Sequence, residues 1–275
     1  MMLQKGLVLE GGGLRGSYTA GALDAFLDGG IEFPYVIGVS AGAGMGCSYV
    51  SRQRGRNLEI LQKYRGDPRY LSIRNYLKTG SIFGMDFVFH RIPNELIPFD
   101  YAGFCESPVR FVTVCTDCDT GEAVYYEKDP RRSAEDFYRI LEASASMPYV
   151  APMVSFGGKK LLDGAVADAL PLAKAVEAGF SSNVVVLTNP GGYRKKKESS
   201  LFALMYRGRK KLLQALNDRV EKYNLTLAHI EEEEKARRVI VIRPSQDLGV
   251  SRVEKSLEKL TALYELGIRD AQRAL

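Results

Sequence analysis

Residues 7–16 read LVLEGGGLRG, an apolar run of three residues followed by a glycine-rich turn. The next segment, residues 17–28, repeats apolar residues at helical spacing, and Gly29-Gly30 follows it. Such spacing is typical of a helix, and glycine commonly ends one. We therefore predict a strand over residues 7–9, a tight turn, and then a helix.

The same order of elements occurs again directly afterwards. Residues 35–37 form a second apolar run, Gly38 begins a turn, and residues 41–52 form a segment rich in Ala and Gly that Gly55 closes. Strands alternating with helices indicate an α/β fold with a largely parallel sheet.

Further segments continue this alternation. We expect strands over residues 110–116, 122–126, 183–188 and 239–242, and helices over residues 133–143, 171–178 and 253–274. A turn at Asp119-Thr120-Gly121 would join the first two of these strands. Ser133-Ala134-Glu135-Asp136 fits the capping box that opens a helix.

The composition excludes several classes of protein. Of the 275 residues, 45% are apolar and 26% charged, which excludes a disordered or fibrous chain. A net charge of +5 is too small to indicate a nucleic-acid partner. The N-terminus has no apolar core of a secretory signal, and no run reaches the roughly 18 apolar residues of a membrane span. We therefore expect a cytoplasmic protein.

The cysteine pattern predicts neither a disulfide framework nor a metal site. Four cysteines occur in the chain: Cys47, Cys105, Cys115 and Cys118. Without an export signal they are expected to be reduced thiols. The last two form a C-x-x-C, yet no second Cys or His pair has ligand spacing, since His90 and His229 are the only histidines.

Aromatic residues concentrate between residues 64 and 104, where 9 of the chain's 27 lie. An even distribution would place only about four in a stretch of this length. We interpret the region of about residues 55–107 as a cap or pocket wall; a satellite core under long loops is the alternative.

Basic residues concentrate in residues 194–211, where eight Lys and Arg against one Glu give a local charge of +7. Leucine, phenylalanine and methionine lie between these charges, as in a basic amphipathic helix that binds an anionic membrane surface. A solvated helix packed on the core is the alternative. We place the segment in a basic helical insertion of about residues 190–237.

Two glycine-containing turns carry the candidate chemistry. Gly11-Gly12-Gly13-Leu14-Arg15-Gly16 contains G-x-G-x-x-G, which alone suggests a dinucleotide-binding oxidoreductase. That site needs an acidic residue at the end of the second strand, which here ends in Gly38-Val39-Ser40-Ala41-Gly42. This G-x-S-x-G is typical of a nucleophile elbow, because a side chain at Gly38 or Gly42 would crowd the turn. The helix dipole would also favour the anionic form of Ser40.

A nucleophilic serine needs a base. The order Ser40, Asp163, His229 would fit an α/β-hydrolase triad, although the elbow of that fold usually follows more strands. A carboxylate is the other candidate. Leu161-Leu162-Asp163-Gly164-Ala165 places Asp163 between an apolar run and a glycine turn, whereas Asp168 fits a helix cap. We therefore take Asp163 as the candidate base.

Together, these blocks resemble the patatin-like phospholipase family. The glycine turn, the serine elbow and the Asp163-Gly164-Ala165 block occur in the order and spacing of that family, and Ala143-Ser144-Ala145-Ser146-Met147-Pro148 resembles a further block. The resemblance covers about residues 5–189, and residues 239–275 look like the tail of a bacterial subgroup. It implies a three-layer α/β/α sandwich with a mostly parallel central sheet, built as a single domain over residues 1–275.

The resemblance also implies a serine and aspartate dyad that hydrolyses acyl esters of lipids, with no metal or cofactor. Ser40 would be the nucleophile and Asp163 the base, and the oxyanion hole would be formed by Gly11, Gly12, Gly13 and Arg15. Gly16, Gly164 and Ala165 complete the motifs. A carboxyl with an ordinary pKa near 4 is a weak base for a serine hydroxyl, so we expect burial to raise the pKa of Asp163.

Two alternatives stay open beside this assignment. Arg15 also fits a buried ion pair that orders the glycine turn. The whole protein could also be a non-catalytic lipid-surface binding protein that uses the basic residues 194–211 and lacks turnover.

Overall fold

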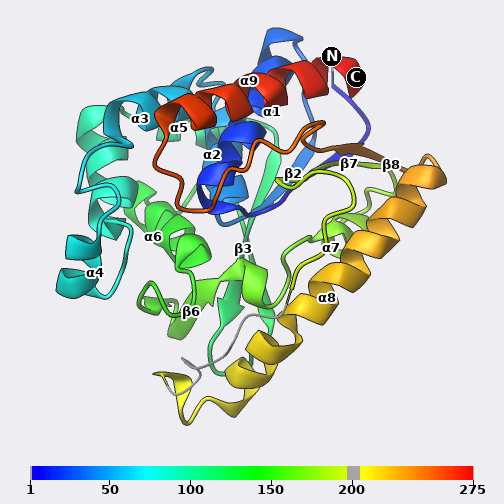
Figure 1. The fold of residues 1–275 in the computed structure, drawn as a ribbon. Coiled ribbons are helices and arrows are strands. Elements are labelled where there is room, and N and C mark those ends of the chain that lie inside the picture. Colours follow the sequence, from blue (N-terminus) through cyan, green and yellow to red (C-terminus); the bar gives the residue numbers. More distant parts are fainter. Residues whose placement is uncertain (1, 197–204, 275) are drawn as a thin grey trace.

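An eight-stranded sheet forms the middle of the computed structural model, which describes residues 2–196 and 205–274 (Figure 1). The strand order is β5-β6-β3-β2-β1-β7-β8, with β4 paired to β3. Five neighbouring strands are parallel: β1 (Gly6–Leu9), β2 (Tyr35–Val39), β3 (Arg110–Asp117), β7 (Asn183–Val186) and β8 (Val239–Ile242).

Both faces of these strands are buried. Successive side chains of a strand point to opposite faces. In β1, Leu7 and Leu9 belong to one apolar cluster and Val8 to another. Strands of this kind are continuous apolar runs, because helices cover both sides of a parallel sheet.

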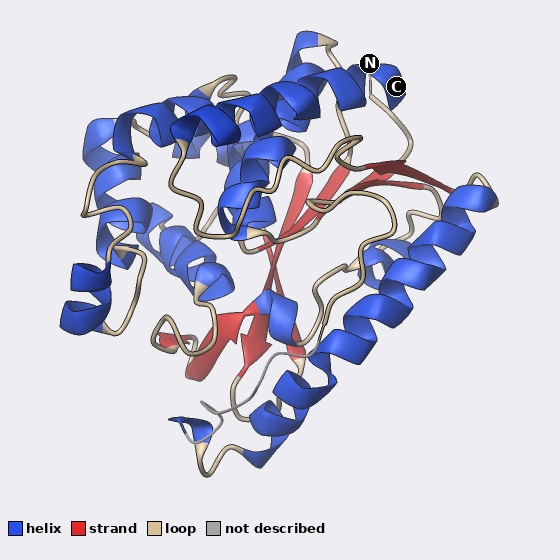
Figure 2. Ribbon diagram, in the orientation of Figure 1, coloured by secondary structure: helices blue, strands red, loops and turns tan. Residues whose placement is uncertain are grey.

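The helices complete a three-layer α/β/α sandwich, as predicted (Figure 2). One face is covered by α1 (Gly16–Asp28), α2 (Ala41–Val50) and α9 (Leu257–Ala274). The opposite face is covered by α7 (Leu172–Glu177) and α8 (Lys210–Lys235).

Antiparallel strands extend the sheet beyond the parallel part: β4 (Ala123–Glu127), β5 (Val154–Phe156) and β6 (Lys159–Asp163). β4 occupies one edge of β3. On the other edge, β2 pairs with β3 as far as Val39 opposite Val114, and β6 pairs with it from Asp163 opposite Cys115. Because β2 is parallel to β3 and β6 antiparallel to it, the carboxyl ends of β2 and β6 meet there. Ser40 directly follows β2, so this register brings it beside Asp163.

The chain between α2 and β3 forms a helical region at one side of the sheet (Figure 1). It comprises α3 (Arg56–Tyr64), α4 (Ile73–Thr79), the π-helix η2 (Phe87–Leu96) and α5 (Tyr101–Glu106). Part of its aromatic content packs on α6 (Ala134–Ala145). The ring centroids of Phe99, Tyr101 and Phe104 lie 4.6 to 5.9 Å from that of Phe137.

Most of the predicted elements are present within a few residues, and two boundaries differ for a visible reason. β7 ends at Val186 rather than at residue 188, because the Thr188 amide donates to the Glu10 carboxylate at 2.6 Å. α9 begins at Leu257 rather than at residue 253, because Ser256 caps it: its Oγ accepts a hydrogen bond from the Lys259 amide at 3.2 Å. The β5–β6 hairpin and the 26-residue length of α8 are not predicted from the sequence.

The basic helix expected over residues 194–211 is wrong where the structure describes that segment. Residues 194–196 lie in irregular backbone, α8 begins only at Lys210, and residues 197–204 lie outside the described residues. Tyr206 and Leu212 face inward, in an apolar cluster with Leu162 and Val166.

Two of the segment's three arginines are paired within the molecule. Arg194 forms an ion pair with Glu231 of α8 at 2.6 Å, and Arg209 pairs with Asp119. Membrane contact through this segment stays a prediction. Within the described ranges, the structure contains no helix whose length and apolar character suffice to cross a membrane.

Candidate active site

Ser40 occupies a strained turn between β2 and α2. Its φ and ψ angles are 54° and −122°, a conformation that residues other than glycine rarely adopt. A Cβ atom at Gly38 would lie 2.6 Å from the amide nitrogen of Ala43, and one at Gly42 would lie 2.6 Å from the carbonyl oxygen of Leu9. The crowding expected at both glycines is therefore present, and the turn places Ser40 at the end of the sheet.

Asp163 is buried at the end of β6 and is 4% exposed. Its Oδ1 accepts a hydrogen bond from the Ala165 amide at 2.8 Å. Burial raises the pKa of Asp163 to about 6, whereas the Ala165 amide, the neighbouring Ser40 side chain and the charges of Arg252 and Lys195 lower it. This burial agrees with the raised pKa expected from the sequence.

The end of α6 holds the two residues in place. The Ser40 amide donates to Ser144 Oγ at 2.9 Å, and Ser144 Oγ donates to the Val114 carbonyl at 2.6 Å. The Asp163 amide donates to the Ser146 carbonyl at 2.9 Å. Both serines belong to the block 143–148 noted in the sequence, which thus fixes the position of Ser40 relative to Asp163.

The glycine turn after β1 lies next to Ser40. The Leu14 amide donates to the Arg252 carbonyl at 3.0 Å, and the Arg15 amide to the Gly12 carbonyl at 3.2 Å. In the part of the chain that the structure describes, the amides of Gly12 and Gly13 have no protein acceptor. A Cβ atom at Gly11 would lie 3.0 Å from that of Ser40.

The first amides of α2 supply further N–H groups that the sequence reading did not include. Ala41 is the first residue of α2, and the opening amides of a helix have no acceptor within it.

Ala41 packs against Gly16, where a Cβ atom would lie 3.0 Å from the Ala41 Cβ. Gly164 begins the 3-10 turn η3 (Gly164–Val166). A Cβ atom added at this position would lie 2.3 Å from the Val114 carbonyl oxygen.

Arg15 hydrogen-bonds to an amide side chain and not to a carboxylate. Its Nη1 donates to Asn189 Oδ1 at 2.6 Å, while its buried Nε has no hydrogen-bond partner among residues 2–196 and 205–274. Among the described residues, no ion pair of Arg15 with a carboxylate is found. The side chain still ties the turn after β1 to the end of β7.

A buried carboxylate that the sequence analysis did not single out lies before the glycine turn. Glu10 is 3% exposed and accepts hydrogen bonds from the Thr188 amide at 2.6 Å, the Thr188 hydroxyl at 3.0 Å and the Tyr223 hydroxyl at 2.7 Å. These bonds join β1, the end of β7 and α8. In the sequence, the position of Glu10 directly before Gly11 could have identified this residue as part of the site.

Two cavities meet at Ser40. The larger has a volume of about 590 Å³, and its walls include most of the predicted site: Gly11, Gly12, Gly13, Arg15, Ser40, Asp163 and Ala165. The smaller has a volume of about 150 Å³ and a mainly apolar lining. Gly13, Ser40 and Met147 border both.

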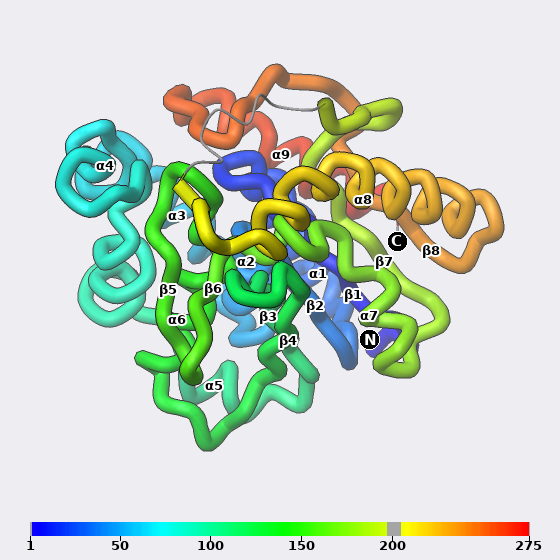
Figure 3. The backbone as a smooth tube through the Cα atoms, turned by 90° about the horizontal axis from the view of Figure 1, so that it is seen from below, coloured from blue at the N-terminus to red at the C-terminus, as the bar shows by residue number. Residues whose placement is uncertain are grey.

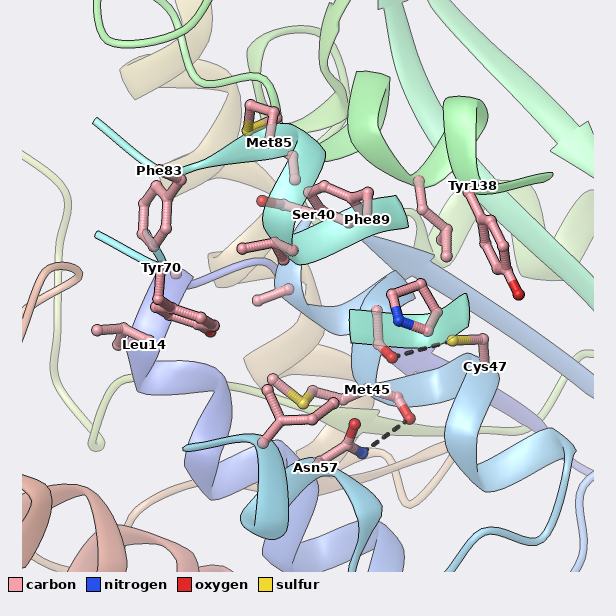
Figure 4. A pocket seen from close by; sticks show the side chains of 18 of the residues that line it. Leu14, Ser40, Met45, Cys47, Asn57, Tyr70, Phe83, Met85, Phe89 and Tyr138 are labelled. Carbon is pink, nitrogen blue, oxygen red and sulfur yellow. Dashed lines mark hydrogen bonds between the residues drawn. The ribbon is translucent and has the colours of Figure 1, made fainter. Parts of the chain in front are cut away.

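The smaller cavity extends from Ser40 into the aromatic-rich region (Figure 4). Tyr70, Phe83, Phe89 and Phe99 of that region line it. Cys47 also lines it and donates from its thiol to the Gly44 carbonyl at 3.1 Å. We call this cavity the apolar pocket.

The histidines and Asp168 lie outside both cavities. His90 contacts Glu135 at 3.1 Å, and His229 is exposed on α8. The triad of Ser40, Asp163 and His229 is therefore not assembled. Asp168 Oδ2 accepts a hydrogen bond from the Tyr125 hydroxyl at 2.8 Å.

The cysteines make no disulfide and no metal cluster. All four are free thiols. Residues 2–196 and 205–274 contain no group of three or more His, Cys, Asp or Glu that could hold a metal ion.

Comparison with known proteins gives two family matches. Residues 7–176 match the model described as patatin-like phospholipase, and residues 209–275 match that of a domain of unknown function, DUF6363. The uncharacterized protein YjjU of Escherichia coli (strain K12) is 25% identical over 189 residues, which cover 67% of this chain and 52% of that protein. The chain thus spans about half the length of this relative.

Among solved structures, VipD from Legionella pneumophila matches with a TM-score of 0.48 and 13% sequence identity. The match covers 98% of this chain and 66% of the VipD chain.

Proposed function

Since the family model matches more than half of it, the chain belongs to the patatin-like phospholipase family, and we propose that it is a serine acyl hydrolase that cleaves carboxylic esters of lipids. One observation carries this proposal. The register of β3 brings Ser40 and Asp163 together at one end of the sheet, where both line the larger cavity and Ser40 also borders the apolar pocket.

In the first half-reaction, Ser40 Oγ attacks the ester carbonyl carbon while Asp163 accepts the hydroxyl proton. The tetrahedral oxyanion is stabilised by the amides of Gly12 and Gly13, which have no protein acceptor among the described residues. The Ala41 amide is a further donor. Removing one such donor typically costs about 10²- to 10³-fold in rate. The bond to the alcohol oxygen then breaks, and Asp163 returns the proton to the leaving alkoxide.

In the second half-reaction, a water molecule attacks the acyl-Ser40 ester and gives its proton to Asp163. The acid leaves, and the proton returns to Ser40 Oγ. The apolar pocket fits the acyl chain, because its lining is mainly aromatic and aliphatic. The larger cavity then receives the alcohol part of the ester.

A fluorophosphonate probe tests this proposal, because it forms a stable adduct only with an activated serine. We expect intact-mass measurement to show one adduct and peptide mapping to place it on Ser40. Heat-denatured protein is the control and should remain unlabelled. A folded protein that takes no adduct would instead favour the non-catalytic lipid-binding alternative.

The pH dependence of kcat/KM follows from the pKa of Asp163, which burial raises to about 6. A general base works only when deprotonated, so kcat/KM should rise with a midpoint near pH 6 and level off about one pH unit above it. The measurement is a pH profile with a water-soluble ester. A midpoint near pH 4 would contradict a raised pKa.

Ser144→Ala should lower kcat more than it changes KM. The substitution removes the acceptor of the Ser40 amide and the donor to the Val114 carbonyl, so the elbow loses its anchor. We expect a decrease in kcat of about 10- to 100-fold and a loss of about 1–3 kcal/mol in the free energy of unfolding.

Ser146→Ala is the matched control for this prediction. Ser146 is equally buried, but its hydroxyl donates only to the Glu142 carbonyl one helical turn earlier. Equal losses of kcat in the two variants would show that Ser144 has no special role in positioning Ser40.

A further inference from the structure

The helix α4 carries the two most exposed large apolar side chains among the described residues. Leu77 is 81% exposed and Ile73 is 74% exposed, and Tyr76, at 38%, lies on the same face of the helix. No residue of α4 is buried. Figure 1 and Figure 3, which view the molecule from directions 90° apart, both show α4 at its outer edge. Single exposed apolar residues are ordinary, but three on one helix face form a patch that indicates a binding surface.

Polar contacts on the other face of α4 keep this apolar patch turned outward. The Asn75 side chain lies on that face, and its Nδ2 donates to the Pro68 carbonyl at 3.1 Å and to the Arg69 carbonyl at 3.2 Å. The helix begins after Ser72, whose Oγ accepts a hydrogen bond from the Asn75 amide at 3.1 Å. These contacts fix the orientation of the helix, so its apolar face points toward solvent.

α4 is the tip of a hairpin formed by residues 70–84, which we call the α4 hairpin. The Gly84 amide donates to the Tyr70 carbonyl at 3.0 Å, and Leu71 pairs with Phe83 in an antiparallel bridge. At this base, Tyr70 and Phe83 line the apolar pocket (Figure 4), and their ring centroids lie 6.2 Å apart. One continuous segment thus joins the exposed patch to the pocket that would hold the acyl chain.

All charged residues of the α4 hairpin are basic. Arg74 and Lys78 are the two, and both are exposed. Each directly follows a residue of the apolar patch, Ile73 or Leu77, so the cations lie along one border of the patch. Neither forms an ion pair with another residue that the structure describes. Cations beside an exposed apolar face complement the negative charge of an anionic lipid surface.

From this arrangement we propose that the α4 hairpin binds the surface of an anionic lipid bilayer. The apolar patch enters the interface between head groups and acyl chains, while Arg74 and Lys78 bind the negatively charged head groups. Bilayer binding goes beyond the proposed function, since it needs no turnover. Its consequence for catalysis rests on that function: a protein held by this hairpin has its acyl pocket next to the lipid that it would cleave.

A single tryptophan tests the surface, because the chain contains none of its own. In Ser40→Ala protein, which leaves the lipid intact, we expect the emission of a Leu77→Trp variant to shift to shorter wavelength with vesicles of phosphatidylcholine and phosphatidylglycerol. Leu225→Trp is the matched control, since Leu225 is a 64% exposed leucine on α8, and its emission should not shift. An unshifted emission of the Leu77→Trp variant, or equal shifts in both variants, would overturn the surface.

Vesicle sedimentation measures what each group contributes. Ile73→Gln combined with Leu77→Gln should lower the partition of the protein onto anionic vesicles by about tenfold. Arg74→Gln and Lys78→Gln should each lower it by about fivefold, and only when phosphatidylglycerol is present. Arg269→Gln on α9 makes the same change in net charge and should leave binding unchanged. All these side chains are exposed, so the variants should keep the wild-type Tm.

Fluorophosphonate labelling of the wild type separates this inference from the proposed function. A protein that is labelled at Ser40, but binds vesicles equally well with and without the α4 substitutions, would overturn the surface and leave the hydrolase in place. Labelling without any vesicle binding would do the same and would leave the apolar patch to a protein partner. Vesicle binding through α4, in a protein that takes no fluorophosphonate, would support the surface and overturn the hydrolase.

Discussion

Ser40→Ala should retain less than about one part in 10⁴ of the wild-type kcat for ester hydrolysis. Loss of a nucleophilic serine costs about 10⁶-fold in well-studied serine hydrolases, because the residual rate comes only from the oxyanion donors and binding. The same donors remain in this variant, since the Gly12 and Gly13 amides do not depend on the serine hydroxyl. KM should therefore change little, and the measurement is a comparison of kcat and KM on one soluble ester.

Ser17→Ala is the matched control for this change. Ser17 is fully buried on α1, and its hydroxyl has no hydrogen-bond partner in the described part of the chain, so its removal should cost little. The two variants together separate the loss of a nucleophile from the loss of any buried hydroxyl. Wild-type turnover by Ser40→Ala would exclude Ser40 as the nucleophile.

The parts of the site that could be predicted from the sequence are those whose geometry depends on a few consecutive residues. The elbow depends on close contacts at Gly38 and Gly42. The Asp163-Gly164-Ala165 turn closes on itself, since the Ala165 amide bonds the Asp163 carboxylate. Such geometry is local, so the residue types alone reveal it.

The parts that were missed depend on contacts between distant segments. The pairing of β2 and β6 with the same edge of β3 is a matter of register, and the short β6 begins with two exposed lysines that hide its strand pattern. The bond between Glu10 and Tyr223 joins residues 213 positions apart. No periodicity in the chain reports such a contact.

The basic segment shows how composition can mislead. Its local charge predicted a basic amphipathic helix on a membrane surface, because the sequence does not reveal the acidic partners of two of its arginines. Arg194 pairs with Glu231 and Arg209 with Asp119. Lys195 turns toward the cavity instead of toward solvent.

Asp163→Asn should reduce kcat by at least about 10³-fold, because the amide cannot accept the Ser40 proton. The change is nearly isosteric, and the Asn oxygen can still accept the Ala165 amide hydrogen bond that orders the turn. The remaining activity should lose the rise toward pH 6 seen in the wild type. Asp86→Asn, an exposed aspartate outside both cavities, is the control and should retain the wild-type profile.

The same variant should be more stable than the wild type at alkaline pH. The pKa of Asp163 in the fold, about 6, lies above its usual value of 3.8, so ionisation of this carboxyl is disfavoured in the folded state. Its stabilising contribution is therefore fully present below about pH 4 and is lost as the pH rises through about 6. The loss in the free energy of unfolding is about 3 kcal/mol. Asparagine does not ionise and avoids this loss. We therefore expect denaturant unfolding to show a higher free energy of unfolding for the variant than for the wild type at pH 8 but not at pH 4. The same difference at both pH values would mean that Asp163 does not lie in a low-dielectric site that favours proton transfer.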